Sequence, residues 1–220
     1  MFSDLEALRD ALDQALALHT RGILAPGTLP PKYRALLLNN GYLLPIHAQW
    51  FLLNYPAYGD GSEAWRRGYW SFVRLYLSQR WGENYCLDAT STLLCRAVAW
   101  EVPQELVVWR REPGSALLEL RQGNRLRICR TKLFPSKVEN VLGIWVMEQN
   151  EALLQVSLSF LQANVDTVRT VLPGVQDTES LLALLHENGQ HRKANWILQE
   201  MLAREKQGEY GKHLTENEVL

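Results

Sequence analysis

The sequence predicts an α+β protein in which an N-terminal winged-helix-like domain precedes a mixed α/β body and a C-terminal helical segment. Two observations indicate the N-terminal part: helix-periodic apolar residues before residue 40, then two short aromatic-rich runs around a tight bend. A third observation concerns the rest of the chain, where strand-like runs give way to helical periodicity from residue 148 onward. Helix, helix and hairpin is the order of elements in a winged helix.

The predicted domain boundaries follow changes in composition along the chain. Residues 54–62 hold one proline and two glycines in a polar stretch, so they are the best linker candidate. We therefore expect a winged-helix-like head over residues 1–55, an α/β body over 62–147, a helical region over 148–207 and a frayed tail over 208–220.

The head is predicted to contain two helices and a hairpin. Ser3 and Glu6 have the spacing of a capping box, which indicates that the first helix begins here. Pro31 is placed to start the second helix, and the hairpin is expected over residues 42–46 and 49–53. Apolar residues at three- and four-residue steps predict the buried stripe of the first helix: Leu5, Leu8, Leu12, Ala15 and Leu16.

The body is predicted to start with a long aromatic helix. Ser62 can cap this helix, which extends to Leu77 and ends by Gly82, and Asp88 can cap a second, shorter helix. In one of the strands that follow, charged residues alternate with apolar ones, which predicts one face exposed to water. The strand-like runs cover residues 106–109, 116–120, 125–129 and 141–146.

The composition is that of an ordinary globular protein, with 47% hydrophobic and 21% charged residues and a formal net charge of −1. The first residues lack the basic and apolar regions of a signal peptide, and no stretch reaches about 18 uninterrupted apolar residues. We therefore expect a cytoplasmic protein without a membrane partner. The three cysteines include no C-x-x-C pair, which favours buried thiols over a disulfide framework or a thiolate metal site.

The sequence contains no familiar catalytic or nucleotide-binding motif. A phosphate loop, a dinucleotide-binding glycine turn and a serine elbow are all missing. His186 and His191 are interpreted as polar loop residues rather than metal ligands, and Glu148 and Glu151 have a spacing routine at helix N-termini. We expect no catalytic residue, no metal and no cofactor, while an active site assembled only in three dimensions stays open as a third class.

The charges are divided unevenly along the chain. Residues 96–137 hold nine basic and four acidic residues, a net of +5, whereas residues 138–220 hold six basic and twelve acidic residues, a net of −6. Such a division can steer a polyanion toward one face, or it can let one half of the molecule dock on the other.

Two blocks of sequence carry a family resemblance. The first is Gly41-Tyr42-Leu43-Leu44-Pro45-Ile46 with Gln49-Trp50-Phe51-Leu52-Leu53. The second is the succession Trp65, Trp70, Phe72, the run Tyr76 to Glu83, Leu87, the run Ser91 to Leu94 and the run Val102 to Val108. Over about residues 30–200 the chain resembles AbiEi-like type IV antitoxins and the related N-terminal regions of some bacterial Fic-family proteins.

This resemblance implies a DNA-binding or operon-regulating head and a body that neutralises a partner toxin or controls a linked enzyme. The bend of the hairpin here is His47-Ala48-Gln49, where a basic residue followed by glycine is typical of the family. The Fic catalytic motif H-P-F-x-x-G-N-G-R is absent, so the nucleotidyl transfer of full-length Fic proteins is not expected.

The expected function is that of a non-enzymatic regulatory or antitoxin-type protein that binds DNA and/or a partner protein in a bacterial toxin–antitoxin or defence system. The alternative is a protein-docking subunit of such a complex without DNA contact, because residues 1–40 carry four basic and four acidic residues and so a net charge of zero. The candidate residues for binding nucleic acid or a partner are Lys32, Arg34, Arg110, Arg111, Arg125, Arg127 and Arg130.

Overall fold

The protein is described by a computed structural model that covers residues 2–97, 102–132 and 134–203, with the backbone alone for residues 2–4. Within these residues it is a mixed α/β protein with three small sheets. The chain forms two units: unit 1 comprises Met1–Cys86, Trp100–Phe134 and Leu142–Trp145, and unit 2 comprises Leu87–Ala99, Pro135–Val141 and Val146–Leu220. The predicted head of residues 1–55 lies in unit 1, and the predicted tail of residues 208–220 lies outside the described residues.

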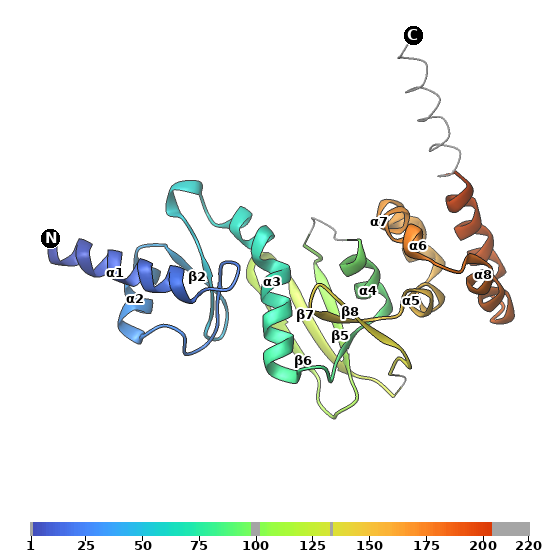
Figure 1. Ribbon diagram of the computed structural model, residues 1–220, viewed down its shortest axis with the longest axis horizontal. Helices are drawn as coiled ribbons and strands as arrows, with labels where there is room; N and C mark the ends of the chain where they lie inside the picture. Colours follow the sequence, from blue (N-terminus) through green and yellow to red (C-terminus); the bar gives the residue numbers. More distant parts are fainter. Residues whose placement is uncertain (1, 98–101, 133, 204–220) are drawn as a thin grey trace, which may run out of the picture. The chain divides into compact units, whose positions relative to one another are not determined.

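The head consists of two helices and a three-stranded antiparallel sheet, the head sheet (Figure 1). Its strand order is β1-β3-β2, and β2 and β3 are joined by a two-residue turn at positions 48 and 49, so the hairpin prediction is confirmed. Along the chain the elements are α1 (Phe2–Leu18), β1 (Ile23–Leu24), α2 (Pro31–Asn39), β2 (Leu43–His47) and β3 (Trp50–Leu53).

The predicted buried stripe of α1 is wrong at two of its five positions. Leu5 and Leu16 are exposed, whereas Ala11 and Ala15 are fully buried. The helix packs on its small residues because it lies close to α2 and the head sheet, where Leu37 and Phe51 complete the core. The spacing of apolar residues alone could not distinguish the buried side of α1 from its exposed side, since leucines occur on both sides.

Unit 1 continues with a short helical turn, η1 (Pro56–Tyr58), and the long helix α3 (Ser62–Trp81). The predicted long helix and its end at Gly82 are confirmed, but the N-cap is Gly61 rather than Ser62. Gly68 allows α3 to lie close to the head sheet, because a Cβ atom there would come within 2.8 Å of Leu52 Cδ1.

The four-stranded body sheet has the order β4-β5-β7-β6. Strands β5 and β7 are parallel, and β6 runs antiparallel to β7 at the edge of the sheet. One face of these strands is buried through Leu106, Val108, Leu126 and Ile128, as the alternating pattern predicts. The elements are β4 (Cys86–Leu87), β5 (Glu105–Arg110), β6 (Ala116–Glu119), the turn η2 (Arg121–Gly123) and β7 (Arg125–Arg130).

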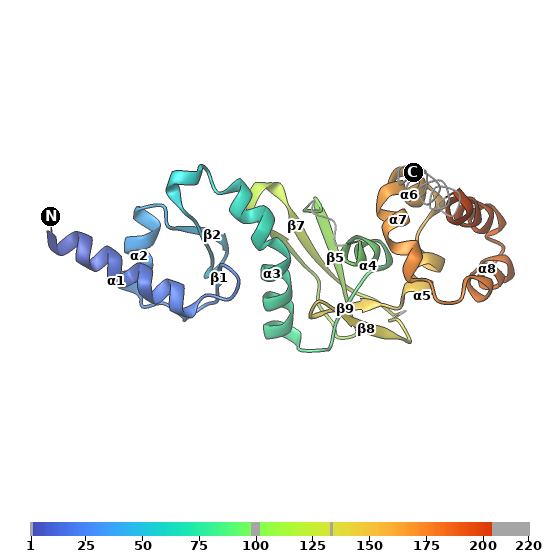
Figure 2. The same ribbon diagram turned by 45° about the horizontal axis from the view of Figure 1, so that its top comes forward.

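Helix α3 also reaches the buried side of the body sheet. Trp65 donates a hydrogen bond from Nε1 to Asn124 Oδ1 at 2.8 Å, just before β7, and the Arg110 guanidinium lies over the Trp81 ring. Both views show α3 running beside the body strands (Figures 1 and 2).

The single strand predicted over residues 141–146 is wrong. The structure has a hairpin there, formed by β8 (Val138–Val141) and β9 (Ile144–Met147), with a turn at Leu142 and Gly143. Both turn residues have positive φ angles, 54° and 83°, as a tight hairpin turn of this kind requires. The turn, which Gly143 makes possible, was not predicted because Leu142 continues the apolar run of the expected strand.

The predicted helical region after residue 148 is confirmed as a series of short helices, and Asp88 caps α4 through the Ser91 amide as predicted. Helix α4 packs against α5 and α7, and α5 packs against α8. The elements are α4 (Ala89–Arg96), α5 (Gln149–Gln155), α6 (Leu158–Ala163), α7 (Val165–Val171), the turn η3 (Leu172–Gly174), α8 (Thr178–Glu187) and a last helix over residues 191–203.

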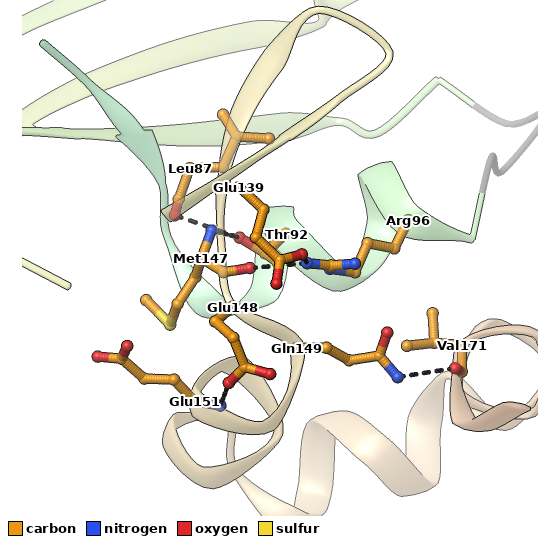
Figure 3. Close-up of polar contacts among 9 residues, drawn as sticks. All are labelled: Leu87, Thr92, Arg96, Glu139, Met147, Glu148, Gln149, Glu151 and Val171. Carbon is orange, nitrogen blue, oxygen red and sulfur yellow. Dashed lines mark hydrogen bonds and ion pairs between the residues drawn. The ribbon is translucent and has the colours of Figure 1, made fainter. Parts of the chain in front are cut away.

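Buried polar contacts tie the end of β9 to α4 and α7 (Figure 3). The Thr92 hydroxyl donates to the Leu87 carbonyl at 3.3 Å and accepts the Met147 amide at 3.1 Å. Arg96 donates to the Met147 carbonyl and pairs with Glu139, and Gln149 donates to the Val171 carbonyl at 2.9 Å.

Among the residues that the structure describes, no helix combines the length and the apolar character that crossing a bilayer demands.

We predict that removing the Thr92 hydroxyl lowers the stability of the protein, even when the size of the side chain is kept. Thr92→Val keeps the volume but leaves the buried Met147 amide without this acceptor, so we expect a loss of about 1–3 kcal/mol in the free energy of unfolding. Thr92→Ser keeps the hydroxyl and is the control. Chemical denaturation of both variants measures the difference between their free energies of unfolding. If Thr92→Val is as stable as Thr92→Ser, the proposed role of the hydroxyl is contradicted.

Candidate binding surfaces

All seven candidate basic residues lie in unit 1, but they do not form one surface. Lys32 and Arg34 are on α2 of the head, and the other five are on β5, on β7 or at the end of β5.

The two basic residues of α2 differ in their surroundings. Lys32 is exposed, whereas Arg34 is half-buried with its guanidinium 5.9 Å from the centre of the Phe51 ring. The helix therefore presents a single exposed cation, which is a small electrostatic contribution for contact with phosphates.

Arg125 and Arg127 lie on the partly exposed side of the body sheet, which we call the outer face. It consists of Glu105, Val107, Trp109, Leu117, Glu119, Arg125, Arg127 and Cys129. Arg127 forms two hydrogen bonds to the Glu105 carboxylate, both at 2.8 Å, and Arg125 approaches the same carboxylate at 3.3 Å. Glu119 lies opposite Arg125 on β6.

The outer face is therefore electrically balanced, with two arginines and two glutamates. The guanidinium of Arg127 beside Glu105 holds the pKa of that carboxyl below its usual range, so Glu105 is ionised at neutral pH. The remaining residues of the face are apolar. This face offers no surplus of positive charge to a nucleic acid.

A surplus of positive charge is found at the carboxyl ends of β5 and β7, which meet at one edge because the two strands are parallel. Arg110 and Arg130 are partners in the register of these strands. We call this group the strand-end cluster: Arg110, Arg111, Glu112, Arg130 and Lys132, with four basic residues and one acid.

Two arginines of the strand-end cluster are held against aromatic rings. The Arg110 guanidinium lies 4.7 Å from the centre of the Trp81 ring and pairs with Glu112, and its side chain is only 13% exposed. The Arg111 guanidinium lies 4.5 Å from the centre of the Phe134 ring. Cation–π contacts fix both side chains in place, while Arg130 and Lys132 are exposed at the rim.

Reactive groups show no comparable assembly in the described parts of the chain. Burial raises the pKa of Cys95 to about 12, which keeps this thiol protonated and unreactive. His186 and His191 share one Nδ1 to Nδ1 hydrogen bond of 2.7 Å, and within residues 2–97, 102–132 and 134–203 no three metal-ligating side chains gather.

The sequence did not reveal two features of these surfaces. Lys132 is one of the nine basic residues of 96–137, but its charge alone does not show that it belongs to the strand-end cluster. Glu105 was not matched with Arg127 because the two are paired through parallel strands and lie 22 residues apart. The alternation of charged and apolar residues in β7 is a sequence signal for the pairing of Glu105 with Arg127. This signal can be interpreted only when the partner strand and its register are known.

Comparison of the chain with protein-family models and with curated proteins finds no match. The resemblance to AbiEi-like antitoxins therefore stays a prediction from the residues quoted above.

The pairing of Glu105 with Arg127 predicts how the pKa of the Glu105 carboxyl group changes when Arg127 is replaced. Arg127→Gln removes the strongest cause of the lowered pKa, so the pKa of Glu105 should rise toward 4.5 in a ¹³C NMR titration. In the unaltered protein the ion pair stabilises the fold above the unfolded pKa, and this contribution disappears as the pH falls through the lower folded pKa. Arg130→Gln should leave Glu105 unchanged; an equal shift in both variants would refute the pairing.

Proposed function

We propose that this chain is a non-enzymatic, antitoxin-type regulatory protein of the bacterial cytoplasm that acts by binding, and that its strand-end cluster binds an acidic surface of a partner protein. The observation that carries the proposal is the pair of arginines held on aromatic rings, Arg110 on Trp81 and Arg111 on Phe134, beside the exposed cations Arg130 and Lys132.

Arginines and large aromatic residues are the side chains that contribute most to protein–protein binding. A guanidinium that is already positioned loses less side-chain entropy when it meets a carboxylate than a freely moving lysine does. The strand-end cluster has a net charge of +3, so an acidic partner gains electrostatic complementarity here.

The outer face is less suited to a polyanion, because Glu105 and Glu119 offset Arg125 and Arg127. Its apolar residues Val107, Trp109 and Leu117 suit the same protein partner as an extension of the interface. A protein partner therefore accounts for both surfaces, whereas DNA accounts for one.

DNA binding by a winged-helix head is the second candidate function, and one observation favours it. The head has two helices followed by a hairpin in a sheet of order β1-β3-β2, with Lys32 exposed on the second helix. A helix of this kind can enter the major groove while the hairpin reaches the backbone. The resemblance to AbiEi-like antitoxins supports such an operon-regulating role.

The partner proposal is tested with the protein encoded by the gene adjacent to that of this chain. Arg130→Glu should weaken its binding at least about tenfold, equivalent to about 1.4 kcal/mol, because the substitution places a negative charge inside the strand-end cluster. Lys137→Glu, a charge reversal at another exposed basic residue, on unit 2, is the matched control. Isothermal titration calorimetry measures both. Identical affinities of the two variants would remove the cluster from the interface.

The DNA candidate is tested by titrating salt against the affinity for a duplex taken from upstream of the gene. Contact between the head and phosphates predicts a falling log–log plot, and Lys32→Gln should reduce its slope by about one unit. Arg9→Gln, on the exposed side of α1, is the control. If the protein does not bind the duplex at low salt, the DNA candidate is excluded and protein docking is the remaining candidate function.

A further inference from the structure

Unit 2 contains a cavity of about 650 Å³ that the binding surfaces above do not use. Its walls are two short segments: residues 154–158, which include the end of α5 and the start of α6, and residues 189–193, which lead from the turn after α8 into the first turn of the last helix. This volume falls in the range of small-molecule sites in proteins.

The charge of the cavity differs from that of the sequence around it. His191, Arg192 and Lys193 line it, and none of its ten lining residues is acidic. Residues 138–220 as a whole carry twelve acidic and six basic residues. The basic lining is therefore a local feature and not a reflection of composition.

Lys193 is the one buried basic residue of this lining, with 5% of its surface exposed. Its Nζ donates hydrogen bonds to the Leu154 carbonyl at 2.8 Å and to the Val156 carbonyl at 2.7 Å. An ammonium group has three donors, so these two bonds fix its direction and leave one further donor. Burial lowers the pKa of Lys193 to about 8, so the group remains mostly charged at neutral pH.

Polar groups of residues 189–193 and apolar residues of the other wall add to the effect of Lys193. The last helix begins at residue 191, and its first turn presents backbone N–H groups and the positive end of the helix dipole to this region. Arg192 is exposed at the rim, where its guanidinium can pair with two oxygens of one group. Leu154, Val156 and Leu158 provide apolar wall.

We propose that this cavity binds a small phosphate monoester, with the phosphate held by Arg192 and Lys193 and the organic part against the apolar wall. Two positive groups, Lys193 fixed by its hydrogen bonds and Arg192 exposed at the rim, match a phosphate dianion better than they match a singly charged carboxylate, and the volume exceeds that of a bare phosphate. The site is independent of the proposed partner and DNA surfaces, since all of its residues belong to unit 2.

A purely structural role of Lys193 is the competing explanation, because its two bonds satisfy carbonyls at the end of α5. That role requires neither Arg192 nor a cavity free of acids. Arg192 is exposed, so its replacement tests ligand binding without disturbing the core.

The experiment is calorimetric titration of the full chain with inorganic phosphate, adenosine 5′-monophosphate and adenosine. We expect millimolar or tighter binding of both phosphate probes and none of adenosine. Arg192→Gln should weaken phosphate binding at least about fivefold, and Lys137→Gln, an exposed cation elsewhere in unit 2, should leave it unchanged. The proposal is overturned if neither phosphate probe binds, if adenosine binds equally well, or if the two variants behave alike.

The pH dependence separates Lys193 from the other groups. The affinity for adenosine 5′-monophosphate should rise as its phosphate becomes a dianion near pH 6 and fall again as Lys193 loses its proton at or above pH 8, since a bound anion raises the pKa of Lys193 further. Lys193→Met, checked for folding by circular dichroism, should lack the fall. A fall of equal size in Lys193→Met would exclude Lys193 from the site.

Discussion

Unit 1 depends on the packing of α3 between two sheets. Trp65, Tyr69 and Phe72 are fully buried on this helix, and the centre of the Trp65 ring lies 5.4 Å from that of Tyr69 and 6.0 Å from that of Phe72. The head sheet approaches the helix through Gly68, while Trp65 and Trp81 reach toward the body sheet. Aromatic side chains bury large areas at a low cost in conformational entropy, so one helix can hold both sheets in place.

Helix α3 holds part of the strand-end cluster in place. Trp81 is the last residue of α3 and contacts the Arg110 guanidinium, so the position of this β5 side chain is set by the core of the unit. The outer face lies on the opposite side of the same strands and is balanced by Glu105. The same pair of parallel strands thus carries an electrically balanced face and a cationic end.

Features set by neighbouring residues could be predicted from the sequence, and those set by distant ones could not. The head hairpin, the long helix ending at Gly82 and the Asp88 cap are local, and all three were predicted. The turn at Leu142 was missed because an apolar residue with positive φ resembles strand sequence. The candidate residues were selected by charge alone, and the parallel pairing that neutralises Arg125 and Arg127 brings together residues about 20 positions apart.

Unit 1 is discontinuous in sequence, and its last segment is Leu142–Trp145 at the tip of the β8–β9 hairpin. A chain emerging from the ribosome can form the local contacts of its first helices and hairpin early. It cannot complete unit 1 until residue 145 has been synthesised, by which time the helix α4 and strand β8 of unit 2 also exist. Segments of the two units therefore alternate along the chain, so no single cut can separate one unit from the other.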